Sequence, residues 1–143
     1  MIQKYDMRAD FEQLTYDANK LKSVWKEISL RAKPLVEARW TSHHLLTFID
    51  WINQNAYSGI LFPGFSLGKL LISKPRNGKL NYQQTLAIAY DNQTELFTLQ
   101  YSDWDTITSQ DEYEKAIQWT AKCPGTDLCT NFLEFLKWKS NWD

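Results

Sequence analysis

Near the start of the chain, apolar side chains recur at alternating steps of three and four residues. Steps of this kind place all of the side chains on one face of an α-helix. The positions are Phe11, Leu14, Ala18, Leu21, Trp25 and Ile28. Asp10, with Gln13 three residues later, has the pattern of a capping box at the helix start. Because Pro34 has no backbone N–H, we expect this helix to end or bend near Lys33, and a further helical run to restart at Pro34.

A second amphipathic pattern predicts a helix over about residues 42–55, with Thr41 or Ser42 as its cap. Its apolar stripe covers most of the circumference of the helix. The stripe consists of Leu45, Leu46, Phe48, Ile49, Trp51 and Ile52. A stripe this wide indicates a helix that is buried on more than one side, or one that presents aromatic surface to another molecule.

The period changes to two in the middle of the chain, where glycines and prolines interrupt the helical pattern. Strands are predicted over residues 70–73, 85–90 and 95–101. The dipeptide Asn77-Gly78 is the strongest hairpin signal between them, because both residues tolerate a positive φ. The better core face of the last strand consists of Phe97, Leu99 and Tyr101.

Helical signals return after the third strand. Ser109 with Glu112 fits a capping box and predicts a helix that ends at Cys123-Pro124-Gly125, and Thr126 then caps a last helix. The sequence therefore predicts a single α+β domain over residues 1–143. It has N-terminal helices, a three-stranded antiparallel meander, and C-terminal helices packed on one face of the sheet.

Composition and charge exclude several classes of function. The formal net charge of −1 and the pI of about 6.1 argue against a nucleic-acid partner. No apolar stretch approaches the ~20 residues of a membrane helix, so we expect no membrane association. The first ten residues mix charges and lack the apolar region of a signal peptide, which predicts a cytoplasmic protein.

The two cysteines, Cys123 and Cys129, are too far apart for the usual spacing of zinc ligands, and no histidine lies near them. In a cytoplasmic protein we expect them to be reduced structural thiols. His43 and His44 are adjacent on a predicted helix and point about 100° apart, so they are poorly placed to chelate one metal. We therefore expect no metal and no cofactor.

Acidic and aromatic residues point to a function in protein binding. Residues 1–88 hold 12 Lys/Arg and 7 Asp/Glu, whereas residues 89–143 hold 4 and 10. Aromatic residues make up 15% of the chain, and seven are Trp, more than a core readily hides. The predicted partner-binding residues are Asp103, Trp104, Asp105, Asp111, Glu112, Tyr113, Trp138 and Trp142. Acidic groups beside aromatic anchors suit a basic protein partner.

In size, charge asymmetry and aromatic content the chain is similar to small bacterial immunity proteins that neutralise a toxin. This similarity implies a non-enzymatic inhibitor whose partner is a basic toxin domain. The sequence indicates no oligomeric state.

An alternative hypothesis is a small-ligand domain, or an enzyme, with an aromatic-lined pocket between the sheet and the helices. Its predicted ligand-binding residues are Trp51, Tyr90, Tyr101 and His44. Asp103 and Asp105 on either side of Trp104 could also act as an acid–base pair, although aspartates are common in turns. The reactive side chains are otherwise scattered along the chain, so the sequence favours a binding function over a catalytic one.

Overall fold

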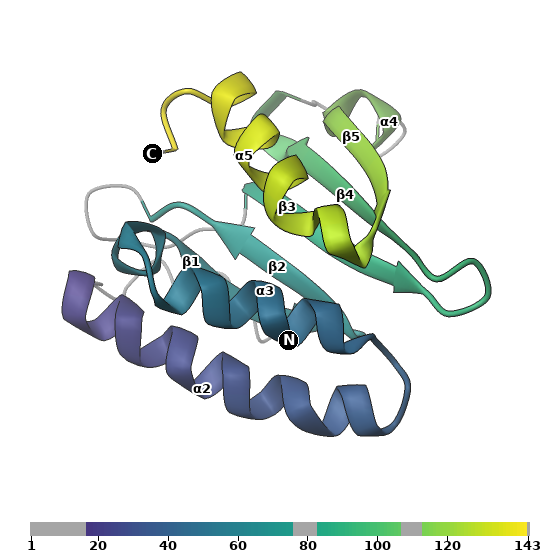
Figure 1. Ribbon diagram of the computed structural model, residues 1–143. Coiled ribbons are helices and arrows are strands. Elements are labelled where there is room, and N and C mark those ends of the chain that lie inside the picture. The colour runs from purple at the N-terminus through teal and green to yellow at the C-terminus, as the bar shows by residue number, and fades with distance from the viewer. Residues whose placement is uncertain (1–16, 76–82, 107–112, 143) are drawn as a thin grey trace, which may run out of the picture.

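The computed structural model describes residues 17–75, 83–106 and 113–142. It confirms the α+β class: among the described residues, two helices are followed by an antiparallel sheet and a C-terminal helix that packs on it (Figure 1). The predicted capping residues Asp10 and Gln13 and the predicted hairpin dipeptide Asn77-Gly78 lie outside the described residues. Within the described part of the chain, no helix is long and apolar enough to cross a membrane.

The first described helix, α2 (Ala18–Glu37), begins at Asp17, whose side chain accepts a hydrogen bond from the backbone N–H of Lys20. Of the two outcomes expected near Lys33, an end or a bend, the end is wrong, because the helix continues through Pro34 for one further turn. It ends in a Schellman motif, in which Trp40 N–H donates to Leu35 and Arg39 N–H to Val36. Arg39 has the positive φ of 64° that glycine usually supplies at this position.

The second helix, α3 (His43–Asn53), has Ser42 as its N-cap, as the sequence predicts. It is followed by a short 3-10 turn, η1 (Ala56–Gly59). Four apolar residues of α3 are buried: Leu45, Phe48, Ile49 and Ile52. In Figure 1, α2 and α3 run side by side below the sheet.

Over the residues that the structure describes, the sheet has five strands in sequential antiparallel order, rather than the three that were predicted. The strands are β1 (Phe62–Ser66), β2 (Lys69–Ser73), β3 (Gln84–Asp91), β4 (Leu96–Asp103) and β5 (Ile117–Pro124). The predicted strands correspond to β2, β3 and β4. The missed strand β1 contains Pro63 and Gly64, which resemble breakers of structure, but proline is tolerated in an edge strand. A two-residue turn, Leu67-Gly68, joins β1 to β2 with positive φ at both residues, as a type I′ hairpin requires.

The helix predicted after Ser109 is mostly wrong. Its capping residues lie outside the described part of the chain, and the described helix α4 (Tyr113–Ala116) lasts only one turn. The chain then continues as β5, paired with β4. A 3-10 turn, η4 (Gly125–Asp127), leads into the last helix, α5 (Leu128–Trp138). Asp127 rather than the predicted Thr126 occupies its N-cap position.

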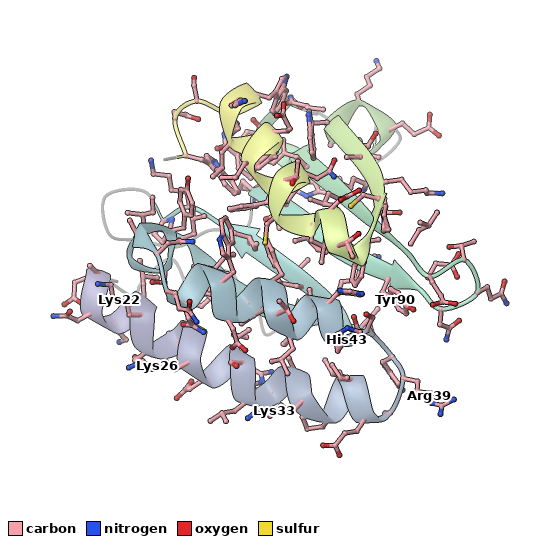
Figure 2. The ribbon with its side chains drawn as sticks, viewed as in Figure 1. Lys22, Lys26, Lys33, Arg39, His43 and Tyr90 are labelled. Atoms are coloured by element: carbon pink, nitrogen blue, oxygen red, sulfur yellow. The ribbon has the colours of Figure 1, made fainter. Side chains whose placement is uncertain are left out.

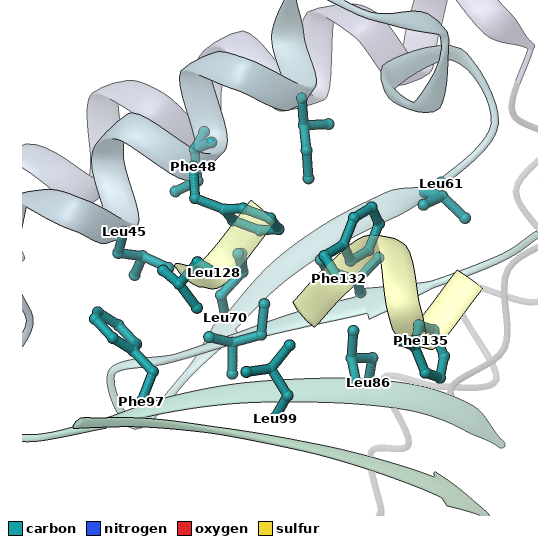
Figure 3. Close-up of a cluster of buried hydrophobic side chains, with 14 of the residues drawn as sticks. Leu45, Phe48, Leu61, Leu70, Leu86, Phe97, Leu99, Leu128, Phe132 and Phe135 are labelled. Carbon is teal, nitrogen blue, oxygen red and sulfur yellow. The ribbon is translucent and has the colours of Figure 1, made fainter. Parts of the chain in front are cut away.

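One face of the sheet is covered by α3 and α5, and the core lies between these layers (Figure 3). Leu45 and Phe48 of α3, together with Phe132 and Phe135 of α5, face the strands. The strands contribute Leu70, Leu86, Phe97, Leu99 and Tyr101, so the predicted core face of β4 is confirmed. The opposite face is lined over β3 and β4 by small or uncharged residues, namely Ala87, Ala89, Thr98 and Gln100.

Candidate functional site

The acidic–aromatic segment that follows β4 forms a short 3-10 turn, η2 (Trp104–Thr106), held by Asp103. One carboxylate oxygen of Asp103 accepts from the backbone N–H of Asp105 at 3.0 Å, and the other accepts from Gln84 Nε2 at 3.1 Å. Thr106 Oγ1 donates to the Asp103 carbonyl at 2.8 Å. Asp103 is buried, whereas Asp105 is exposed. Asp103 therefore fixes the turn, and Asp105 and Trp104 are the residues that the turn presents.

The side chain of Trp104 is 36% exposed. Its backbone N–H donates to the carbonyl of Gln83 at 2.7 Å, which ties the turn to the start of β3. The one-turn helix α4 lies against η2 and carries the exposed carboxylate of Glu114. Tyr113 is the first residue of α4, but its side chain lies outside the described part of the structure, as do Asp111 and Glu112.

Trp138 and Trp142 lie close together but differ in exposure. Both rings pack against Tyr101, each with a centroid distance of 5.7 Å. Trp142 is 1% exposed and belongs to the core, whereas Trp138 is 47% exposed. Because Tyr101 lies near the end of β4, Trp138 is close to the strand end from which Trp104 projects. Of the two predicted contact tryptophans at the C-terminus, only Trp138 is therefore available to a partner.

In the structure, the four predicted ligand-binding residues lie in different surroundings. Trp51 packs with Phe48, Tyr57 and Phe132, at centroid distances of 6.0, 6.1 and 6.2 Å. Tyr90 packs on Phe97 at 4.8 Å. Tyr101 is completely buried among the rings of α5 and Trp142, and His44 lies at the start of α3 beside Gly125. These four side chains do not converge on a common cavity.

A polar hollow of about 390 Å³ does exist, between α2 and the segment that runs from the end of α3 into η1. It is lined by Lys22, Lys26, Asn53, Gln54, Asn55, Ala56 and Ser58. Lys22 and Lys26 are exposed residues of α2 (Figure 2), and Lys22 Cε lies 3.4 Å from a Cβ placed on Gly59 of η1. Two of its carboxamides already donate to backbone carbonyls, Asn53 to Trp25 and Asn55 to Trp51. The hollow is thus partly organised to hold the helices together.

The side chains capable of chemistry form no cluster that could hold a metal ion in the described part of the chain. His43 and His44 lie with their ring centroids 4.1 Å apart, and no group of three metal-binding side chains occurs within residues 17–75, 83–106 and 113–142. Cys123 and Cys129 are free thiols. Burial raises the pKa of both thiols, and the Asp127 carboxylate raises the pKa of Cys123 further. Raised pKa values keep both thiols protonated and weakly nucleophilic near neutral pH, as expected of structural cysteines.

His44 has a packing role that can be tested. A Cβ atom placed on Gly125 would collide with the His44 side chain, so Gly125→Ala should force His44 to move and separate η4 from α3. We expect a loss of about 1–3 kcal/mol in the free energy of unfolding, measured by urea denaturation. The control is Gly59→Ala, where the new Cβ meets ordinary contacts of 3.4 Å or more. Equal stability of the two variants would contradict close packing of His44 on Gly125.

The fold creates three exposed features that were not predicted from the sequence. Trp40 is 61% exposed and lies against the β1–β2 turn, where Leu67 is 90% exposed. Strand β5 lies at an edge of the sheet, with its exposed Thr120 and Lys122. The period-two alternation of residues 117–123 was the available signal for β5. No sequence signal identifies the exposure of Trp40.

Comparison with protein-family models, with curated proteins and with solved structures found no match to this chain.

Proposed function

We propose that this protein is a non-enzymatic protein-binding domain that contacts its partner through the acidic–aromatic surface, defined as Trp104, Asp105, Glu114 and Trp138. The single observation that supports this proposal is the exposure of two indoles at one end of β4, 36% for Trp104, which is followed by the exposed Asp105, and 47% for Trp138, which packs on Tyr101 of that strand. Interfaces obtain much of their binding energy from a few tryptophan, tyrosine and arginine side chains.

The local structure suits this role because the surface is held in place before binding. Asp103 uses both carboxylate oxygens to fix the η2 turn, and the Trp138 ring packs on Tyr101 and Phe135 at 5.7 and 6.2 Å. Side chains that are already positioned lose less entropy on binding. Rigid support of the exposed indoles therefore favours affinity.

The charge of the surface favours a basic partner. Asp105 and Glu114 are exposed, and Asp111 and Glu112 lie between them in the sequence. Complementary charge accelerates association and selects against acidic partners. The partner class that fits best is a basic toxin domain, which would make this protein an immunity or inhibitor protein whose carboxylates occupy the place of an anionic substrate.

The test is capture of the partner from a lysate of the native host, followed by binding kinetics with the purified partner. We expect Trp104→Ala and Trp138→Ala each to weaken binding about tenfold or more. Charge reversal of Asp105 and Glu114, each to lysine, should slow association and reduce its dependence on salt. Trp40→Ala is the matched control, because Trp40 is 61% exposed but lies at the β1–β2 turn. If the partner binds the surface variants as tightly as the wild type, or if Trp40→Ala alone weakens binding, the proposed surface is wrong.

A further inference from the structure

The two edges of the sheet differ in their protection against pairing with another strand. At one edge, β1 has five residues, contains Pro63 and Gly64, and lies against α2. Proline cannot donate a ladder hydrogen bond, and a covered edge is closed to other chains. These features block the β1 edge.

The β5 edge has few features that would prevent pairing with another strand. It is eight residues long, has no proline before its last residue, and carries Lys122 as its one charged side chain. The irregularity in its pairing with β4 lies between Tyr101 and Ser102, so the register from Trp119 to Pro124 is regular. Within the part of the chain that the structure describes, β5 pairs on one side only, and Figure 1 shows it at the border of the sheet. A long, regular and nearly uncharged edge is a template for a further strand.

We propose that β5 pairs antiparallel with β5 of a second copy of this chain, which joins the two sheets into one continuous sheet across a twofold axis. The charges permit this pairing. A register centred on Thr120 places Lys122 opposite Gln118 of the second copy, and a register centred on Ala121 places it opposite Thr120. In both registers the two lysines avoid each other, and like charges directly opposite would be destabilising.

On the face of β5 that lies toward the helices, the side chains of one subunit would also fit against those of the second copy. Trp119 points to this face, where its ring lies 5.2 Å from that of Phe135. In the register centred on Thr120, the small Ala121 of one subunit lies opposite the large Trp119 of the other. Large and small side chains on facing strands pack without steric conflict.

The blocked edge explains why this association would close at two subunits. Pairing of β5 with β5 uses the same surface on both copies, so the interface is isologous. Each subunit then has only its β1 edge left, where Pro63 and α2 prevent a further addition. Strand pairing with two open edges would instead propagate into a fibre. A second copy of this chain would thus give β5 a hydrogen-bonded neighbouring strand, and the resulting dimer would have no sheet edge open to a further strand.

The test is the mass of the purified chain by sedimentation and light scattering over a concentration series up to the millimolar range. We expect the wild type to reach twice its mass of 16.9 kDa. Thr120→Lys should raise the dissociation constant of the dimer about tenfold or more, because the new lysine faces its own copy in one register and Lys122 in the other. Thr120 is exposed, so the monomer fold should be retained, as verified by circular dichroism. Ser66→Lys is the matched control, since Ser66 is an exposed hydroxyl residue in the blocked strand β1.

Thr120→Glu identifies the register: it should weaken the dimer if Thr120 faces itself and strengthen it if Thr120 faces Lys122. Amide hydrogen exchange provides a second measurement, in which protection of β5 should increase with protein concentration. A wild type that remains monomeric up to millimolar concentration would overturn the proposal and leave β5 to a strand from another protein. A dimer that neither Thr120 substitution changes, or one that Ser66→Lys disrupts equally, would also overturn it.

Discussion

Replacing Trp142 with alanine is expected to lower the free energy of unfolding by about 3–5 kcal/mol. The indole is 1% exposed and packs edge-on against Phe135 at 5.2 Å and Tyr101 at 5.7 Å. Its removal leaves a cavity beside Phe135 and Tyr101, which the neighbouring side chains fill only partly. The loss is a large fraction of the ~5–15 kcal/mol that stabilises an ordinary domain. Urea denaturation followed by circular dichroism measures it.

Trp138→Ala provides the matched control for this prediction. Its ring contacts the same two neighbours, Tyr101 and Phe135, but it is 47% exposed. We therefore expect a loss of about 1 kcal/mol or less, because most surface substitutions have small effects on stability. Trp138→Ala should instead reduce partner binding. If the two variants lose equal stability, the assignment of Trp142 to the core and Trp138 to the surface is wrong.

The parts of the fold that the sequence predicts are those determined by local periodicity. Leu21, Trp25 and Ile28 share the buried face of α2, as their spacing requires, and Ser42 caps α3. The alternation of Phe97, Leu99 and Tyr101 identifies the core face of β4. In each case the local pattern of the sequence and the tertiary environment favour the same conformation. This agreement is why the sequence alone predicts these elements correctly.

The errors occur where a local signal competes with a longer-range one. Residues 117–123 alternate between apolar and polar side chains, but the capping pattern at Ser109 and Glu112 favours a helix. Pairing with β4 decides between them, since it satisfies the backbone of β5 and places Trp119 and Cys123 on the core side. Pro63 and Gly64 similarly conceal β1, whose position at the edge of the sheet makes proline acceptable. Neither edge position can be read from the local sequence.

The candidate site is predictable only in part for the same reason. The residue types of the acidic–aromatic surface are visible in the sequence, but the exposure of each indole depends on how α5 lies over β4. Trp104 and Trp138 are distant in sequence and come to the same end of β4 through the packing of Trp138 on Tyr101. Trp142 has the same residue type and a similar location, yet it is buried.

Replacement of Trp25 is the second change expected to lower the free energy of unfolding strongly. Trp25 joins α2 to the sheet both by packing and by a hydrogen bond. The indole is completely buried, and its Nε1–H donates to the Leu61 carbonyl at 2.7 Å, just before β1. Trp25→Ala should cost about 3–5 kcal/mol in the free energy of unfolding. Trp25→Phe keeps much of the packing but removes the donor from a buried carbonyl, and should cost about 1–3 kcal/mol. Urea denaturation of both variants separates the two contributions. A Trp25→Phe variant as stable as the wild type would mean that another donor satisfies Leu61, so that Trp25 holds α2 against β1 by packing alone.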